Sequence, residues 1–127
     1  MVKYLIDTNV VIDYLWHKLP KGGEDFMQRV IDEVPKVSLI TEIELFGYNN
    51  SVEDEKILSD FFNIAEVLPI TNKEKDICIE MKKKRRSKTP DALIAATAIS
   101  HNYTLLTHNV ADFKKIEGLK VVDPHTL

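Results

Sequence analysis

The sequence predicts an α/β fold of three layers, in which a central, mostly parallel sheet lies between two layers of helices. Short apolar runs suited to strands alternate along the chain with segments whose apolar residues recur at helical spacing. This alternation is typical of parallel sheets covered by helices on both faces. Neither a repeat nor a linker-like stretch divides the chain, so we expect residues 1–127 to form a single domain.

Five short apolar runs are the predicted strands. In chain order they are Lys3–Ile6, Lys36–Ile40, Glu66–Ile70, Thr104–Thr107 and Leu119–Val122. Pro69 has no N–H to donate to a neighbouring strand, so the third run is expected at an edge of the sheet or at a strand end.

Helical spacing or helix-start residues predict the remaining elements. In chain order these helices span 8–16, 24–33, 41–47, 51–64, 71–84, 90–101 and 109–113. Thr8 or Asn9 is expected to cap the first helix. His17–Gly23 contains Pro20 and the pair Gly22-Gly23, and is therefore predicted to be a loop.

Composition narrows the class of protein. The net charge of −3, from 17 basic and 20 acidic residues, gives no overall signal for nucleic acid, so any such signal must be local. The single cysteine, Cys78, rules out an internal disulfide and a cysteine-rich zinc site. No signal peptide is expected at the N-terminus, and no apolar run approaches the length of about 18 residues that spans a membrane. We therefore expect a cytoplasmic protein without a membrane partner.

Four acidic residues lie at or near predicted helix starts: Asp7, Glu44, Asp91 and Asp112. Asp7 stands between two apolar runs, where an uncompensated carboxylate is costly to bury. The carboxyl ends of parallel strands meet at one edge of a sheet, and sites form outside that edge. The acids that follow strands are therefore expected to point toward the same place.

Helix capping is a competing explanation for three of these acids. Thr41-x-x-Glu44 matches a capping box, and Asn109-x-x-Asp112 resembles one. Pro90 before Asp91 favours a helix start, and acids in a first turn suit the helix dipole. Capping is the better explanation for each of these taken alone. It explains Asp7 less well, because the neighbours of Asp7 are apolar.

The combination of four acids favours a metal site. Carboxylates brought to one sheet edge repel one another and raise each other's pKa. Mg²⁺ and Mn²⁺ remove that penalty, because they take oxygen ligands and keep several waters. Such ions bind phosphate oxygens, activate a water and stabilise a leaving oxygen, which is the chemistry of phosphodiester hydrolysis.

Four stretches in this order resemble the PIN-domain ribonucleases, and most closely the VapC-type toxins of prokaryotic toxin–antitoxin pairs. They are LIDTNVVID (5–13), SLITEIELFG (38–47), PDALIAATAI (90–99) and LLTHNVADF (105–113). The resemblance implies a PIN-like α/β/α fold and an acidic site that binds Mg²⁺ or Mn²⁺, made by Asp7, Glu44, Asp91 and Asp112. It also implies supporting polar roles for Thr8, Asn9, Thr107 and Asn109.

The function implied by the resemblance is that of a metal-dependent endoribonuclease acting as a toxin. Its substrate would be RNA, its partner a cognate antitoxin, and its assembly a homodimer. Asp7 and Asp91 are expected to coordinate metal directly, and Glu44 and Asp112 through waters. The family pattern has its second acid directly before Leu45, which selects Glu44.

A basic run precedes the third acid and consists of Lys82, Lys83, Lys84, Arg85, Arg86 and Lys88. Cations at a helix end also suit the helix dipole, so a solvated helix end is one explanation. The run is equally suited to guide an RNA backbone toward Asp91 or to bind an acidic segment of an antitoxin.

Three other functions remain open at this point. A receiver-like phosphoacceptor domain also has an acidic Mg²⁺ site, but it needs paired acids after the first strand and a late lysine. A non-catalytic PIN-like binding module and a free-standing RNA-processing nuclease are the other two. Asp13 is interpreted as a surface or helix-pairing residue, and His108 as a weak signal beside the site.

Overall fold

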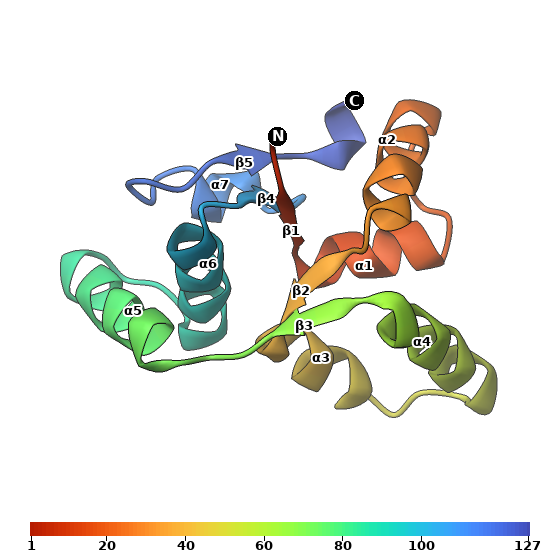
Figure 1. Cartoon of the computed structure of the whole chain (residues 1–127), viewed down its shortest axis with the longest axis horizontal. Helices are drawn as coiled ribbons and strands as arrows, with labels where there is room; N and C mark the ends of the chain where they lie inside the picture. Colours follow the sequence, from red (N-terminus) through yellow and green to blue (C-terminus); the bar gives the residue numbers. More distant parts are fainter.

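The computed structural model describes all residues from Met1 to Leu127 and is built around one five-stranded sheet (Figure 1). The strands are β1 (Tyr4–Ile6), β2 (Lys36–Ser38), β3 (Glu66–Leu68), β4 (Thr104–Leu106) and β5 (Val121–Val122). Their order is β3-β2-β1-β4-β5, and every neighbouring pair is parallel. The predicted parallel sheet is confirmed, and β3, which precedes Pro69, is an edge strand.

Helices cover both faces of this sheet. They are α1 (Thr8–Leu15), α2 (Lys21–Asp32), α3 (Leu39–Phe46), α4 (Val52–Ile64), α5 (Asn72–Lys84), α6 (Thr89–His101), α7 (Val110–Phe113) and the 3-10 helix η1 (Pro124–Thr126). In Figure 1, α5 and α6 lie on one side of the strands, and α1, α2 and α4 lie on the other. No helix has both the length and the apolar character needed to cross a bilayer.

Neighbouring residues of the central strands supply the two cores. Successive side chains of a strand point to opposite faces. Leu5 and Leu105 belong to the core beneath α5 and α6, whereas Ile6 and Leu106 belong to the core beneath α1, α2 and α4. All four side chains are fully buried, as expected for a parallel sheet covered on both faces.

Helix α2 begins earlier than the sequence predicted. We expected a loop over His17–Gly23, but Gly22 and Gly23 lie inside α2. A Cβ atom at Gly23 would stand 2.1 Å from Pro124 O, and one at Gly22 would stand 2.2 Å from Leu127 O. The absence of side chains at these glycines therefore lets the C-terminal segment pack closely against α2, and the glycines do not form a turn.

Three helix starts also differ from expectation. Asp7 itself is the N-cap of α1, in place of Thr8 or Asn9. Helix α3 begins at Leu39 with Ser38 as its cap, so β2 is shorter than predicted and no capping box forms at Thr41. Asn109 precedes α7 without a side-chain capping bond. Side-chain oxygens at strand ends thus start α1 and α3 directly.

Candidate active site

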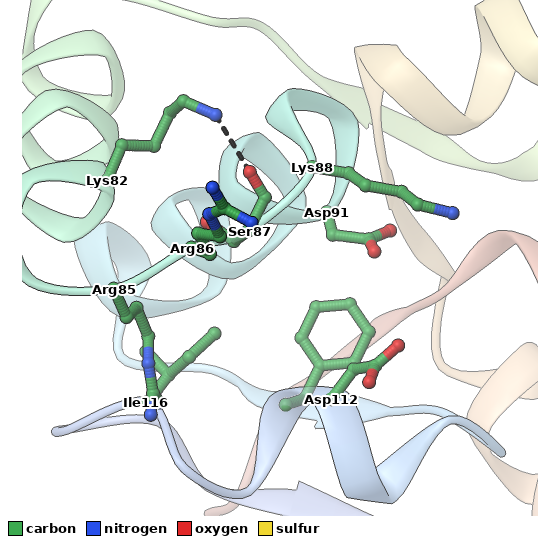
Figure 2. A pocket seen from close by; sticks show the side chains of 9 residues that line it. Lys82, Arg85, Arg86, Ser87, Lys88, Asp91, Asp112 and Ile116 are labelled. Atoms are coloured by element: carbon green, nitrogen blue, oxygen red, sulfur yellow. Dashed lines mark hydrogen bonds between the residues drawn. The ribbon is translucent and has the colours of Figure 1, made fainter.

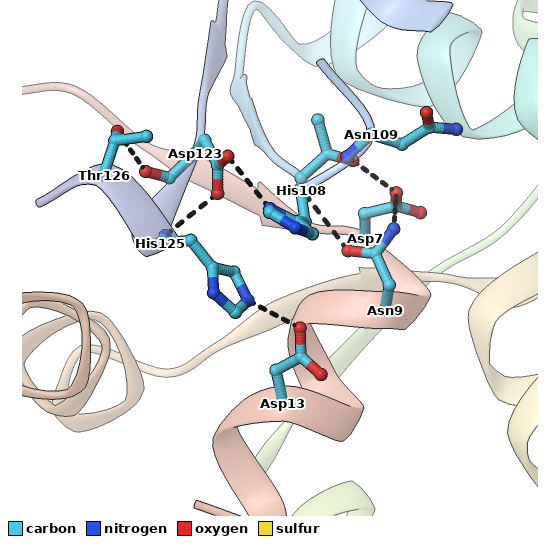
Figure 3. A network of polar contacts seen from close by, with 9 residues as sticks. Asp7, Asn9, Asp13, His108, Asn109, Asp123, His125 and Thr126 are labelled. Atoms are coloured by element: carbon cyan, nitrogen blue, oxygen red, sulfur yellow. Dashed lines mark hydrogen bonds and ion pairs between the residues drawn. The ribbon is translucent and has the colours of Figure 1, made fainter. Parts of the chain in front are cut away.

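Asp7 lies where β1 passes into α1, beside the end of β4. The residue is 4% exposed and its carboxylate accepts three hydrogen bonds, of which Figure 3 shows those to Oδ2. The Thr8 N–H donates to Oδ1 at 2.8 Å, and Asn9 Nδ2 and Thr107 Oγ1 donate to Oδ2 at 3.1 and 2.7 Å. These donors offset part of the cost of burying the carboxylate, and they fix its orientation.

The acids are close enough to affect one another's protonation. Burial is the main cause that raises the pKa of Asp7, hydrogen bonds oppose it, and Asp91 and Glu44 raise it further. Burial also raises the pKa of Asp91, as do Asp112 and Glu44, while the Lys88 ammonium lowers it. Burial and the neighbouring acids therefore both disfavour the charged forms of Asp7 and Asp91.

Glu44 points from α3 toward α1. Thr8 Oγ1 donates to Glu44 Oε1 at 2.7 Å and lies 3.0 Å from Thr41 Oγ1. The capping-box interpretation of Glu44 is wrong, because Ser38 starts this helix and Glu44 bonds to another element. The side chain of Glu42 makes no hydrogen bond or ion pair with the rest of the chain.

Asp112 lies in the short helix α7, and its carboxylate is oriented by the side chain of Asn109. Asn109 Nδ2 donates to Asp112 Oδ2 at 2.8 Å, and the Asn109 N–H donates to Thr107 Oγ1 at 3.0 Å. The predicted capping box is again absent, since Asn109 contacts the side chain of Asp112. Asp112 and Asp91 line the same pocket (Figure 2).

Comparison with known proteins agrees with this arrangement. The family model of the PIN domain matches residues 4–119. The chain belongs to the PIN-domain family. It is 48% identical to the protein named ribonuclease VapC1 of Rickettsia felis, over 93% of each chain.

Solved structures extend the PIN-domain match to three dimensions. VapBC-1 from nontypeable Haemophilus influenzae matches with a TM-score of 0.76 and 28% identity, covering 98% of each chain. A toxin–antitoxin complex from Klebsiella pneumoniae matches with a TM-score of 0.72 and 27% identity, covering 96% of this chain and 98% of that one. The predicted three-layer PIN-like fold is confirmed, and the match argues against a receiver-like domain.

The carboxylate oxygens of this PIN domain suit a hard divalent cation, although they do not form a complete coordination site. No group of three or more His, Cys, Asp or Glu side chains is arranged to hold one ion. Mg²⁺ typically binds one or two carboxylates and keeps its other positions for waters and phosphate oxygens. The carboxylates of Asp7 and Asp91, whose charged forms are disfavoured by burial and by the neighbouring acids, have the chemistry for that mode of binding. The assignment of metal ligands stays a prediction.

The basic run is divided by the structure. Lys82, Arg85, Arg86 and Lys88 line the pocket that also contains Asp91 and Asp112. Lys83 and Lys84 do not line it, and Lys83 pairs with Glu80 at 3.2 Å. The predicted run is therefore two sets of cations that face different surroundings.

A C-terminal network beside the site escaped the sequence analysis. Asp13 was expected at the surface or between helices, and its Oδ2 lies 2.8 Å from Nε2 of His125 in the 3-10 helix η1. His108 Nδ1 lies 3.0 Å from Asp123 Oδ2, and the two histidine rings are 4.0 Å apart (Figure 3). The backbone N–H of His108 also donates to Asn9 Oδ1 at 3.2 Å, and Asn9 in turn donates to Asp7, which joins this network to the acidic site.

One signal of this network was present in the sequence. Asp123 directly follows the last predicted strand, at the same sheet edge as Asp7. His125, by contrast, is recognisable only from the fold, because the residue that it contacts lies at the other end of the chain.

Proposed function

We propose that this chain is a metal-dependent endoribonuclease that serves as the toxin of a prokaryotic toxin–antitoxin pair. The observation that carries the proposal is the placement of Asp7, which is buried, held by three donors and within electrostatic reach of Asp91 and Glu44. The identity of 48% with a protein named ribonuclease VapC1 supports RNA as the substrate.

Mg²⁺ or Mn²⁺ would be held directly by Asp7 and Asp91, with Glu44 and Asp112 acting through waters. A bound ion would supply positive charge for the phosphate oxygens and would acidify the attacking water. Oxygen-only ligands favour these two metals over softer ones.

The polar residues around the acids set their geometry. Thr107 and Asn9 hold Asp7, and Thr8 holds Glu44 through Oε1. Glu44 Oε2 accepts no hydrogen bond from the protein, and neither does Asp112 Oδ1. These two oxygens are the atoms that we expect to orient waters and to accept a proton from one of them.

The partner that we propose is a cognate antitoxin, supported by the likeness to the toxin–antitoxin complex from Klebsiella pneumoniae. By family analogy, the chain would act as a homodimer in the cytoplasm. The rival function, a free-standing RNA-processing nuclease, needs no such partner.

Two measurements test the proposal. The purified chain should cleave RNA with Mg²⁺ or Mn²⁺ and lose this activity in EDTA. Expression should arrest bacterial growth, and coexpression of the product of the adjacent reading frame should relieve the arrest. Cleavage without growth arrest or antitoxin binding would favour the processing nuclease, whereas absence of metal-dependent cleavage would overturn the proposal.

A further inference from the structure

A pocket of about 520 Å³ lies beside two of the acids and has an opposing basic wall. Figure 2 shows Asp91 and Asp112 on one side, with Lys82, Arg85 and Arg86 across from them. Lys88 stands next to Asp91 and lowers its pKa, although burial and the other acids raise it more. The pocket therefore combines four cations with two carboxylates, in a chain whose net charge is negative.

The cations of the basic wall have no carboxylate partner within hydrogen-bonded ion-pair distance. None of its cations forms an ion pair with a carboxylate, whereas Lys83, their neighbour in sequence, pairs with Glu80. Arg85 Nη1 and Ser87 Oγ are also buried without any hydrogen-bond partner. A buried donor without an acceptor is unfavourable, so these atoms favour a ligand that brings oxygen acceptors.

The connection between α5 and α6 holds this wall in place. Lys82 Nζ donates to the Ser87 carbonyl at 2.8 Å, which closes the loop (Figure 2). The Arg85 N–H donates to Met81 O at 3.2 Å and ends α5. Arg85 and Ser87 are thus presented by an ordered turn of the backbone.

We propose that this pocket binds a phosphate group of the RNA strand next to the phosphate that is cleaved. The inference rests on the proposed function, because Asp91 and Asp112 mark the cleavage position. Guanidinium groups match phosphate oxygens by paired hydrogen bonds, and Arg85 and Arg86 both line the wall. An RNA strand that is cleaved at the acids has further phosphates on either side of the cleaved one. The basic wall offers hydrogen-bond donors to such a neighbouring phosphate.

The basic run supplies its own matched control. Arg85→Gln with Arg86→Gln removes two positive charges from the pocket wall. Lys83→Gln with Lys84→Gln removes the same charge from adjacent positions outside the pocket. Both pairs are placed in the Asp7→Asn background, which is expected to bind RNA without cleaving it. The probe is a fluorescein-labelled single-stranded RNA of random sequence, about 12 nucleotides long, a length that covers one binding site.

Binding is followed by fluorescence anisotropy with Mg²⁺ over a range of salt concentrations. The arginine pair should weaken binding by about tenfold, as expected for the loss of one good charged contact. It should also reduce the slope of log Kd against log salt by about 0.7, the value for one phosphate contact on a single strand. The lysine pair should change Kd by less than about threefold, since its charges act only at long range.

Three outcomes would overturn the inference. Equal losses in both pairs would mean diffuse attraction by the run and no phosphate subsite. Unchanged RNA binding with weakened capture of the coexpressed antitoxin would assign the wall to an acidic antitoxin segment. Unchanged binding of both would leave the pocket without this role. Metal-dependent cleavage by the wild-type chain separates these failures from failure of the proposed function.

Discussion

The carboxylate of Asp7 is buried among hydrogen-bond donors, with no cation of the protein beside it. Its donors come from both central strand ends, Thr8 and Asn9 after β1 and Thr107 after β4. Such a carboxylate keeps its orientation but retains a charge that burial disfavours. Replacing Asp7 by asparagine therefore removes the charge of the side chain while its shape is kept.

Asp7→Asn and Asp91→Asn should each abolish metal-dependent RNA cleavage while the fold is kept. Asparagine preserves the shape of the side chain, and it is as good an N-cap as aspartate. The loss should exceed the roughly 10–100-fold that removal of an outer partner of a metal site costs. Cleavage rates with Mn²⁺ and circular dichroism are the measurements, with the exposed Asp60→Asn as control. Wild-type rates in either variant would place the site elsewhere.

Glu44 allows a sharper comparison, because the side chain of the nearby Glu42 forms no hydrogen bond and no ion pair. Glu44→Gln can still accept the Thr8 hydroxyl through Oε1, so stability should stay within about 0.5 kcal/mol of wild type. Cleavage should fall by about tenfold or more, because the lost charge serves the metal site. Glu42→Gln should change neither quantity. Melting curves and Mn²⁺-dependent cleavage rates of both variants are the measurements. Full activity in Glu44→Gln would show that Glu44 does not belong to the active site.

At the scale of the element, helix starts were harder to predict than helices. Thr41 as a helix-start residue predicted that α3 exists, but its cap is Ser38, because a strand end with a serine can start a helix at once. Gly22 and Gly23 had the composition of a turn, and only the approach of the C-terminal segment explains them as helical. The start of α3 is therefore set by a local cap, whereas the start of α2 depends on a tertiary contact.

Helices α5 and α6 are joined by a buried acid that has a consequence for acid stability. Glu74 forms a capping box with Thr71 and accepts a hydrogen bond from Ser100 of α6. Burial raises the pKa of Glu74, but the bonds from Ser100 and Thr71 outweigh it and lower the pKa from 4.5 to about 2. The folded chain therefore prefers the ionised acid more strongly than the unfolded chain does.

The contribution of Glu74 should be fully present above pH 4.5 and disappear as the pH falls toward 2. At about 1.4 kcal/mol per pKa unit, it amounts to roughly 3.5 kcal/mol at most. Glu74→Gln keeps the hydrogen-bonding shape but cannot titrate, so its unfolding free energy should fall less steeply across this range. Urea unfolding of both proteins at several pH values measures the difference. Parallel curves would show that Glu74 does not carry this dependence.

For the whole molecule, the order of strands and helices was predictable, and so was the gathering of acids at one sheet edge. Both follow from the alternation of predicted strands and helices along the chain and from the geometry of parallel sheets. The pairing of Asp13 with His125 was not predictable, since the two are 112 positions apart and no motif contains both. The same limit applied to the division of the basic run, which depends on how α5 ends.

Metal binding should stabilise the molecule as a whole. A ligand that binds only the folded state raises stability by mass action, by about 2.7 kcal/mol at a hundred times its Kd. Mn²⁺ should therefore raise the melting temperature of the wild-type chain. The triple variant Asp7→Asn, Asp91→Asn, Asp112→Asn should lose this shift and melt higher than the metal-free wild type, because burial disfavours the Asp7 and Asp91 charges. A shift of unchanged size in the triple variant would point to ions bound elsewhere.

The docked C-terminus decides where a purification tag belongs. The carbonyl of Leu127 lies against Gly22, and His125 holds Asp13 of the helix that Asp7 caps. A fusion added after Leu127 would extend from this packed end and pull on α1. Met1 is fully exposed at the other end of the chain, so a tag placed there avoids the contacts of the C-terminal segment.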